Sequence, residues 1–308
     1  MRRRRLLAAL ALLPASLAGC NGRTAPTTPR PTDADPAIPG PTATPLTETR
    51  PLPEPPDAPS AQEALAFVRE YERIAARNRI VEHGGERGAR NPEVGEPAAA
   101  LAATTDAGFY LFGACRASGE YGERGGYGIN RHEVPHFVGR EGRHEVAPWS
   151  AVVCESADRA FAADDPAENA VAPEEYYGAE IHLFRFDGAA RDVRVLVDYL
   201  DDGAPQAVYS TTVEASDDAP DPAYEYVLGN LAVRRGTYRV SVDVADAAVD
   251  DPDATATWTL SDPDAPAWTG LSVFVGEDGR PAIGLPDAAD DSLVPGPSLC
   301  ATQLEDER

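Results

Sequence analysis

Two histidines and a glutamate stand at a spacing that can build a zinc centre. His132, Glu133 and His136 follow the pattern His-Glu-x-x-His. On a helix, histidines four residues apart share one face and bind Zn²⁺, and the glutamate acts as general base toward a zinc-bound water. Pro135 opposes that chemistry, because a proline inside a helix removes a backbone donor and costs about 3 kcal/mol. We therefore expect no catalytic residue in this motif and no enzyme activity from the chain.

The surrounding sequence favours two strands over a helix. Residues 131–134 read Arg-His-Glu-Val, and residues 143–146 repeat the same four letters. The segment 139–142 begins and ends with glycine and supplies a turn between the two runs. The motif is therefore expected in a β-hairpin, whose side chains alternate between two faces.

The register of this hairpin decides which histidines can meet. We expect Gly139 to pair with Gly142, which places His132 and His136 on one face and His144 on the other. A three-histidine metal site is then excluded, and no cofactor is expected. A two-histidine metal site at His132 and His136 stays open, with ordinary cross-strand His–Glu and Arg–Glu pairs as the alternative.

A helix and several strands should position the hairpin. Ser60 and Glu63 match a capping box, and apolar residues at helical spacing predict a helix over 61–82 that ends at two glycines. One long helix with an antiparallel sheet makes an α+β domain, expected over 61–155. Its element order is similar to cystatin-like and NTF2-like folds. The expected strands are 98–103, 108–117, 134–138 and 146–154.

The second half of the chain has the pattern of an all-β domain. Short runs of alternating hydrophobicity are separated by turn signals, which predict hairpins at 186–189 and at 276–279. This pattern indicates an Ig-like β-sandwich over 177–286. The run Gly-Thr-Tyr-Arg-Val-Ser-Val at 236–242 resembles a strand common in Ig-like and transthyretin-like extracellular domains. By that resemblance, Tyr238 occupies the position of the tyrosine corner.

The first twenty residues have the character of an export signal. Four arginines precede an apolar run over 6–18, and Leu-Ala-Gly stands before Cys20. The run is shorter than the roughly 20 residues of a membrane-spanning helix, so we expect a signal peptide over 1–19. The ending resembles the lipobox of prokaryotic lipoproteins, which implies a lipid on Cys20 and a location at the outer side of the cell membrane. The arginines also resemble a twin-arginine export motif, and both export routes stay open.

A stalk is expected between the lipid and the domains. Residues 21–60 contain twelve prolines and eight threonines, a composition that cannot bury a core and favours extended, disordered chain. With the lipidated Cys20, the stalk would cover 20–60. A polar, acidic linker is expected at 156–176 and a C-terminal tail at 287–308.

The charge of the chain limits its partners. It carries 51 acidic residues against 27 basic ones, all of them arginine, for a net charge of −24. Such a charge opposes binding to nucleic acid, and high salt would screen its self-repulsion. An acidic, lysine-free chain with this signal and stalk resembles surface lipoproteins of haloarchaea, which implies adaptation to high salt and brings no catalytic residue with it.

Three cysteines remain besides Cys20. Cys115, Cys154 and Cys300 would face a compartment that permits disulfides, and three thiols allow at most one bridge. We expect a Cys115–Cys154 disulfide, because both residues lie in strand-like runs of one domain. Cys300 stays open as a partner of either, and three free thiols are the remaining alternative.

These features predict a membrane-anchored extracytoplasmic lipoprotein with a non-catalytic binding or envelope-structural role. Its partners would be the membrane, through the lipid on Cys20, and a cell-surface protein or glycan. The alternative is a lipoprotein that captures a ligand or a metal ion, either in a pocket between the helix and its sheet or at His132 and His136.

Overall fold

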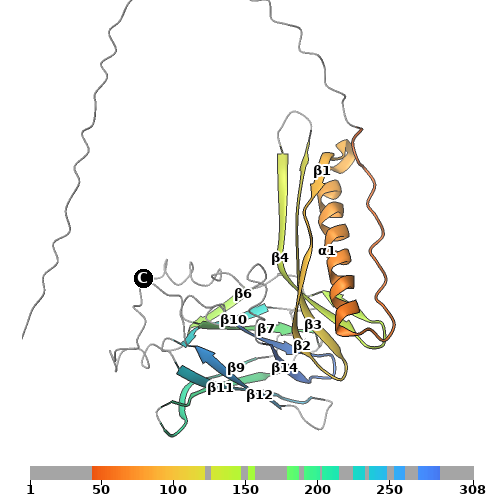
Figure 1. The fold of residues 1–308 in the computed structure, drawn as a ribbon. Coiled ribbons are helices and arrows are strands. Elements are labelled where there is room, and N and C mark those ends of the chain that lie inside the picture. Colours follow the sequence, from red (N-terminus) through yellow and green to blue (C-terminus); the bar gives the residue numbers. More distant parts are fainter. Residues whose placement is uncertain are drawn as a thin grey trace, which may run out of the picture. The chain divides into compact units, whose positions relative to one another are not determined.

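A computed structural model describes ten segments of the chain, all within one compact unit over 43–308. They comprise one helix, a short 3₁₀ turn and fourteen β-strands (Figure 1). The predicted signal peptide, Cys20, Cys300, the tail and all of the linker except its first residue, Ser156, lie outside the described residues. No described helix is long and apolar enough to span a membrane. The described segments are 44–121, 126–146, 152–156, 179–186, 191–201, 203–214, 225–232, 236–247, 253–260 and 270–284.

The predicted helix is confirmed as α1, Ala61–Gly84. Its capping box is complete: the Glu63 amide donates to Ser60 Oγ at 3.3 Å, and the Ser60 amide donates to Glu63 Oε2 at 2.8 Å. Gly85 ends the helix with φ at +53°, a conformation that suits glycine, and the 3₁₀ turn Gly85–Arg87 follows. Every fourth residue along one side of the helix is buried, and these residues are Ala64, Val68, Glu72, Ala76 and Ile80.

An antiparallel five-stranded sheet carries α1 on one face. Its order is β1-β3-β4-β5, and β2 pairs with the other end of β3. The long strand β3 presents Phe109 and Leu111 to Val68 and Phe67 of the helix. The strands are β1 (Arg90–Val94), β2 (Ala98–Thr104), β3 (Gly108–Glu120), β4 (Gly126–Gly139) and β5 (His144–Val146).

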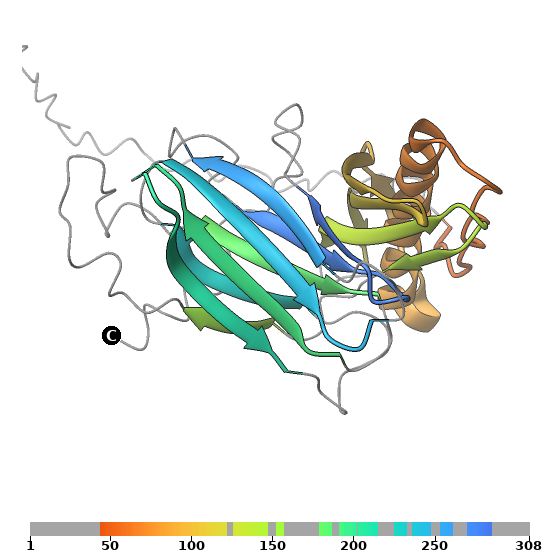
Figure 2. The same cartoon turned by 90° about the horizontal axis from the view of Figure 1, so that it is seen from below.

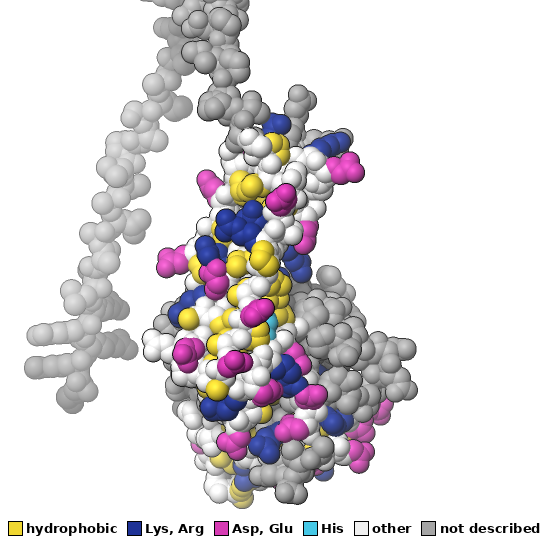
Figure 3. All heavy atoms as spheres, turned by 90° about the vertical axis from the view of Figure 1, so that its right-hand side faces the viewer, with side chains coloured by type: hydrophobic (Ala, Val, Ile, Leu, Met, Phe, Trp, Pro, Cys, Tyr) yellow, Lys and Arg dark blue, Asp and Glu magenta, His cyan; other side chains and the backbone are white. Residues whose placement is uncertain are grey.

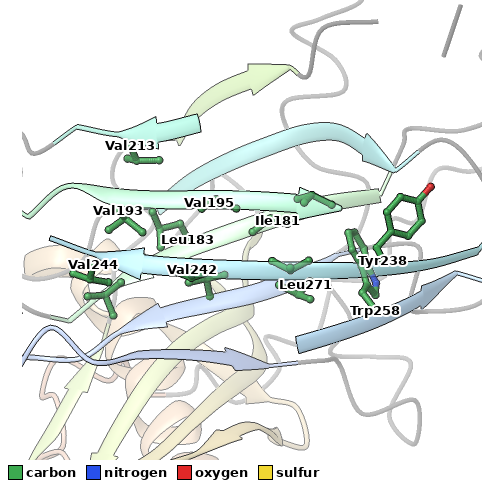
Figure 4. Packing of buried hydrophobic residues seen from close by; sticks show 14 of the residues in the cluster. Ile181, Leu183, Val193, Val195, Val213, Tyr238, Val242, Val244, Trp258 and Leu271 are labelled. Atoms are coloured by element: carbon green, nitrogen blue, oxygen red, sulfur yellow. The ribbon is translucent and has the colours of Figure 1, made fainter. Parts of the chain in front are cut away.

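The remaining strands form two sheets that pack face to face. One has the order β14-β13-β7-β10-β6, and the other has the order β12-β11-β8-β9 (Figure 2). Side chains from both sheets fill the space between them, among them Leu183, Val195, Val242 and Trp258 (Figure 4). The strands are β6 (Val152–Ser156), β7 (Ala179–Arg185), β8 (Val193–Tyr199), β9 (Gln206–Val213), β10 (Glu225–Ala232), β11 (Gly236–Val244), β12 (Asp253–Leu260), β13 (Leu271–Val275) and β14 (Pro281–Gly284).

The chain is therefore α+β with a β-rich second part, but two local predictions were wrong. The turn signal at 186–189 does not join a hairpin, because β7 pairs with β10 and β13 whereas β8 pairs with β9 and β11 in the other sheet. The single strand expected over 146–154 is two strands, β5 and β6, and β6 pairs in parallel with β10. The hairpin at 276–279 is confirmed by the β13–β14 pair.

The two parts of the described chain share a core of aromatic rings. Tyr110 and Phe112 point away from α1 on the second face of β3, and they contact Phe184 of β7 and Phe274 of β13. The Tyr110 and Phe274 rings stack with centroids 4.7 Å apart, and the Phe112 and Phe184 rings meet edge to face at 5.6 Å. The sheet under α1 is thus covered on both faces.

The disulfide predicted at Cys115 is not formed. Cys115 is a free, buried thiol on β3, where its Sγ lies 3.6 Å from the carbonyl oxygens of Gly95 and Arg116. Cys154 lies on β6, whose partner β10 belongs to another sheet. The prediction failed because both cysteines were assigned to one sheet, and the side chain of Cys154 is outside the described residues.

Candidate functional site

A fully buried carboxylate lies at the centre of the interface between α1 and its sheet. Glu72 projects from α1, and Arg131 of β4 donates two hydrogen bonds to it, from Nε to Oε2 at 2.6 Å and from Nη2 to Oε1 at 2.8 Å. This two-point geometry is the strong form of an arginine–carboxylate pair. It joins the middle of the helix to the middle of the strand.

Two histidines extend this pair into a chain. His136 Nε2 lies 3.0 Å from Glu72 Oε1, and His136 Nδ1 lies 3.0 Å from His144 Nε2. An ionised carboxylate only accepts hydrogen bonds, so Nε2 of His136 carries the proton. Its Nδ1 then accepts from His144 Nε2–H, which leaves His144 Nδ1 as an acceptor at the outer end of the chain.

Aromatic side chains of α1 close the site on the helix side. The Tyr71 ring meets the His144 ring at 4.5 Å and the His136 ring at 5.5 Å, both edge to face. The Phe67 ring meets His144 at 4.7 Å in the same manner. Gly113 of β3 leaves room for this packing, because a Cβ there would lie 2.7 Å from Glu72 Cγ and 2.8 Å from His136 Nε2.

The turn before β5 brings His144 to this face, which corrects the predicted register. The Gly139 amide donates to the Arg143 carbonyl at 2.8 Å, so the loop has three residues instead of two. Gly142 closes it with φ at +78°. Val138 consequently pairs with His144, and a shift of one residue moves every side chain of a strand to the opposite face. His144 therefore shares a face with His136, contrary to the prediction.

A β-bulge in β4 brings Arg131 to the same face. Gly113 pairs with Val134, but Cys115 pairs with Arg131, so one extra residue of β4 lies between the two pairs. Strict alternation would place residue 132 on the helix-facing side together with His136. The bulge puts Arg131 there instead. The side chains of His132 and Glu133 lie outside the described residues.

Burial and the neighbouring groups fix the charges of the chain. Burial opposes ionisation of Glu72, but hydrogen bonds from Arg131 and His136 outweigh it and lower its pKa to about 2. Burial lowers the pKa of His136. Burial and the nearby His136 lower the pKa of His144 to about 3. At neutral pH the cluster therefore contains one anion, one cation and two neutral imidazoles.

This arrangement is suited to holding the helix on the sheet. A general base works best with a pKa near the working pH, and His144 is far below that range. Both nitrogens of His136 are engaged, so a metal ion would have to displace Glu72 or His144 from it. Over the described part of the chain, no three His, Cys, Asp or Glu side chains are grouped to hold a metal.

Sequence reasoning named His136 but missed Glu72 and Arg131. Glu72 did leave a signal, because it is the one charged residue in the buried stripe at spacing four that begins at Ala64. A carboxylate in such a stripe needs a buried partner. Arg131 left no signal, since its position depends on the bulge.

An acidic residue of the second part is also paired. Asp198 of β8 is buried and accepts from Arg239 of β11, from Nε at 3.1 Å and from Nη2 at 2.5 Å. The two residues are cross-strand neighbours, which accounts for the contact.

Comparison with known proteins gives no relative. No family model, curated protein or solved structure matches this chain.

Proposed function

We propose that this protein is a membrane-anchored lipoprotein that displays its folded unit outside the cell for a non-catalytic binding or envelope-structural role. The observation that carries the proposal is the ending Leu-Ala-Gly-Cys20 after a basic and an apolar run. The acidic composition supports a role at high salt, where self-repulsion is screened.

The buried cluster supports the non-catalytic part of this proposal. Glu72, Arg131 and His136 satisfy one another, and the pKa of His144, about 3, keeps it neutral. A buried polar network of this kind specifies how a helix packs on a sheet. The buried cluster is therefore better suited to stabilising the fold than to catalysing a reaction.

The finer fold assignments belong to the same proposal. The face-to-face sheets, with Tyr238 and Trp258 fully buried between them, support an Ig-like sandwich. The helix on an antiparallel sheet supports a cystatin-like or NTF2-like first part.

Substitution at the lipidation site tests the anchor. The full-length protein and Cys20→Ser are expressed in a haloarchaeal host, cells are fractionated, and the mature N-terminal peptide is analysed by mass spectrometry. We expect the parent protein in the membrane fraction with a lipid mass on Cys20, and Cys20→Ser outside that fraction. Cys300→Ser is the matched control and should stay with the membrane. An unmodified Cys20, or membrane retention of Cys20→Ser, would refute the anchor.

Ligand capture is the second candidate function, and a cavity favours it. A hollow of about 290 Å³ lies between α1, β1 and residues 46–50. This volume is near the lower end of the range found for small-molecule binding sites.

A further inference from the structure

Residues 46–50, which precede α1 in the chain, form one side of the cavity beside the helix. Leu46 pairs with Ala89 through two backbone hydrogen bonds of 2.8 and 2.9 Å. Asn78 of α1 holds Arg50, because its Oδ1 accepts from the Arg50 amide at 2.8 Å and its Nδ2 donates to the Arg50 carbonyl at 2.7 Å. The sequence predicted a disordered stalk over 20–60, but these contacts fix Leu46 and Arg50 on the folded unit, so the prediction was wrong for this part of the segment. Both residues line the cavity.

Three arginines converge on this cavity. Arg50 comes from residues 46–50, and Arg73 and Arg77 come from successive turns of α1. Among the residues that the structure describes, no acidic side chain lines the cavity. In a chain with 51 acidic residues and 27 arginines, three arginines around one cavity contrast with the overall charge. On the side of the molecule that carries α1, Figure 3 shows arginine side chains interspersed with acidic ones.

Among the described residues, a single carboxylate forms an ion pair with any of these three arginines. Glu70 binds Arg73 through two hydrogen bonds of 2.9 and 2.6 Å. Among the described residues, Arg50 and Arg77 form no ion pair with a carboxylate, and Arg77 donates only to Glu48 O and Asn78 Oδ1. Burial lowers the pKa of Arg77, and the nearby positive charge of Arg50 lowers it further, so the two guanidiniums repel each other. A bound anion would relieve that repulsion.

The rest of the cavity is apolar. The other described lining residues are Leu46, Ile74, Pro92 and Val94. A ligand that is only a small ion would leave this surface in contact with water, whereas a short hydrocarbon group would cover it.

We propose that this cavity binds a small organic anion, with its carboxylate or phosphate group against Arg50 and Arg77 and a short apolar body over Leu46, Ile74 and Val94. Guanidinium groups match both anions through paired hydrogen bonds. The segment fixed by Asn78 pre-organises Arg50, which reduces the entropy lost on binding. This inference names a ligand class for the binding role proposed above and does not depend on lipidation of Cys20.

Calorimetric titration of the full chain tests the ligand class. The probes are butyl phosphate, pentanoate, inorganic phosphate and butanol, each titrated in the same high-salt buffer, in which the folded state is verified. We expect butyl phosphate and pentanoate to bind, inorganic phosphate to bind about tenfold more weakly than butyl phosphate, and butanol to show no heat of binding. Equal affinity for butyl phosphate and butanol, or for butyl phosphate and inorganic phosphate, would overturn the proposal.

Matched arginine variants test the site. Arg50→Gln and Arg77→Gln should each weaken butyl phosphate binding by about tenfold. Arg79→Gln removes the same charge from an exposed position of α1 outside the cavity and should leave the affinity unchanged. Equal losses in all three variants would indicate a general charge effect and refute the site. Unfolding curves confirm that the variants fold, and none of these outcomes bears on the anchoring test at Cys20.

Discussion

Nδ1 of His136 lies 3.0 Å from Nε2 of His144, although the two residues belong to different strands of the β4–β5 hairpin. Because His136 also contacts Glu72, this hydrogen bond connects β5, at the edge of the sheet, to the middle of α1. The two strands of the hairpin and the helix are thereby joined by one polar chain within an apolar interface. Substitutions that break this polar chain should therefore lower the free energy of unfolding.

Glu72→Gln should destabilise the protein by about 3 kcal/mol, because it leaves the guanidinium of Arg131 buried without its counter-charge. The measurement is denaturant-induced unfolding at constant salt. Glu70→Gln is the control: Glu70 forms an exposed pair with Arg73, so its loss should cost less than about 0.5 kcal/mol. Similar losses in both variants would contradict the assigned role of Glu72.

The free energy of unfolding should fall as the pH is lowered from 7 to 3. Between its ordinary pKa of 6.5 and its folded pKa of about 3, His144 binds a proton in the unfolded state only. Between its ordinary pKa of 4.5 and its folded pKa of about 2, Glu72 likewise binds a proton in the unfolded state only. The unfolded state therefore binds more protons across this range, and stability is lost with acid.

His144→Gln isolates the histidine contribution to this pH dependence. The variant keeps a hydrogen-bond donor toward His136 but cannot titrate, so part of the stability loss between pH 6.5 and 4.5 should disappear. The check is a set of unfolding curves at several pH values for both proteins. An identical pH profile in parent and variant would rule out a neutral, buried His144.

Gly142→Ala should cost about 1 kcal/mol, because alanine disfavours the positive φ that closes the three-residue loop. Thermal unfolding measures the loss. Gly126→Ala adds the same methyl group where the nearest atom lies 3.6 Å away, and it should change stability by less than about 0.5 kcal/mol. A two-residue loop, as the sequence first suggested, would tolerate alanine at 142 equally well.

The helix-bearing part and the β-sandwich should unfold in one transition, because their aromatic side chains form a common cluster. Phe274→Ala should destabilise by about 3 kcal/mol or more and broaden or split this transition. Differential scanning calorimetry measures both the loss of stability and the shape of the unfolding transition. Leu52→Ala, at an exposed position, should leave the transition single and nearly unshifted. Two transitions in the parent protein would show that the shared cluster does not couple the parts.

Cys115 should resist thiol reagents until the protein unfolds. Its side chain is buried, and burial raises its pKa to about 11, so little thiolate forms at neutral pH. Alkylation followed by peptide mass mapping, with and without denaturant, tests this for Cys115 separately from Cys154 and Cys300. Recovery of a disulfide-linked Cys115 peptide without reduction would contradict the free thiol.

The sequence alone determined the features that depend on near neighbours. The capping box at Ser60 and Glu63, the apolar stripe of the helix and the β13–β14 turn were all predicted, since hydrogen bonds and spacing within a few residues fix them. The same local patterns gave the α+β first part and the β-rich second part. They also predicted a lipid on Cys20.

Tertiary structure alone decided which side chains meet. A loop of three residues placed His144 beside His136, and a bulge placed Arg131 beside Glu72. Both are one-residue differences, and in a strand one residue reverses the face. The pairing of β6 with β10 and the position of Cys115 depend on competition among distant strands, which no local pattern encodes. The cavity arginines converge for the same reason, because packing brings residue 50 against a helix that begins eleven residues later.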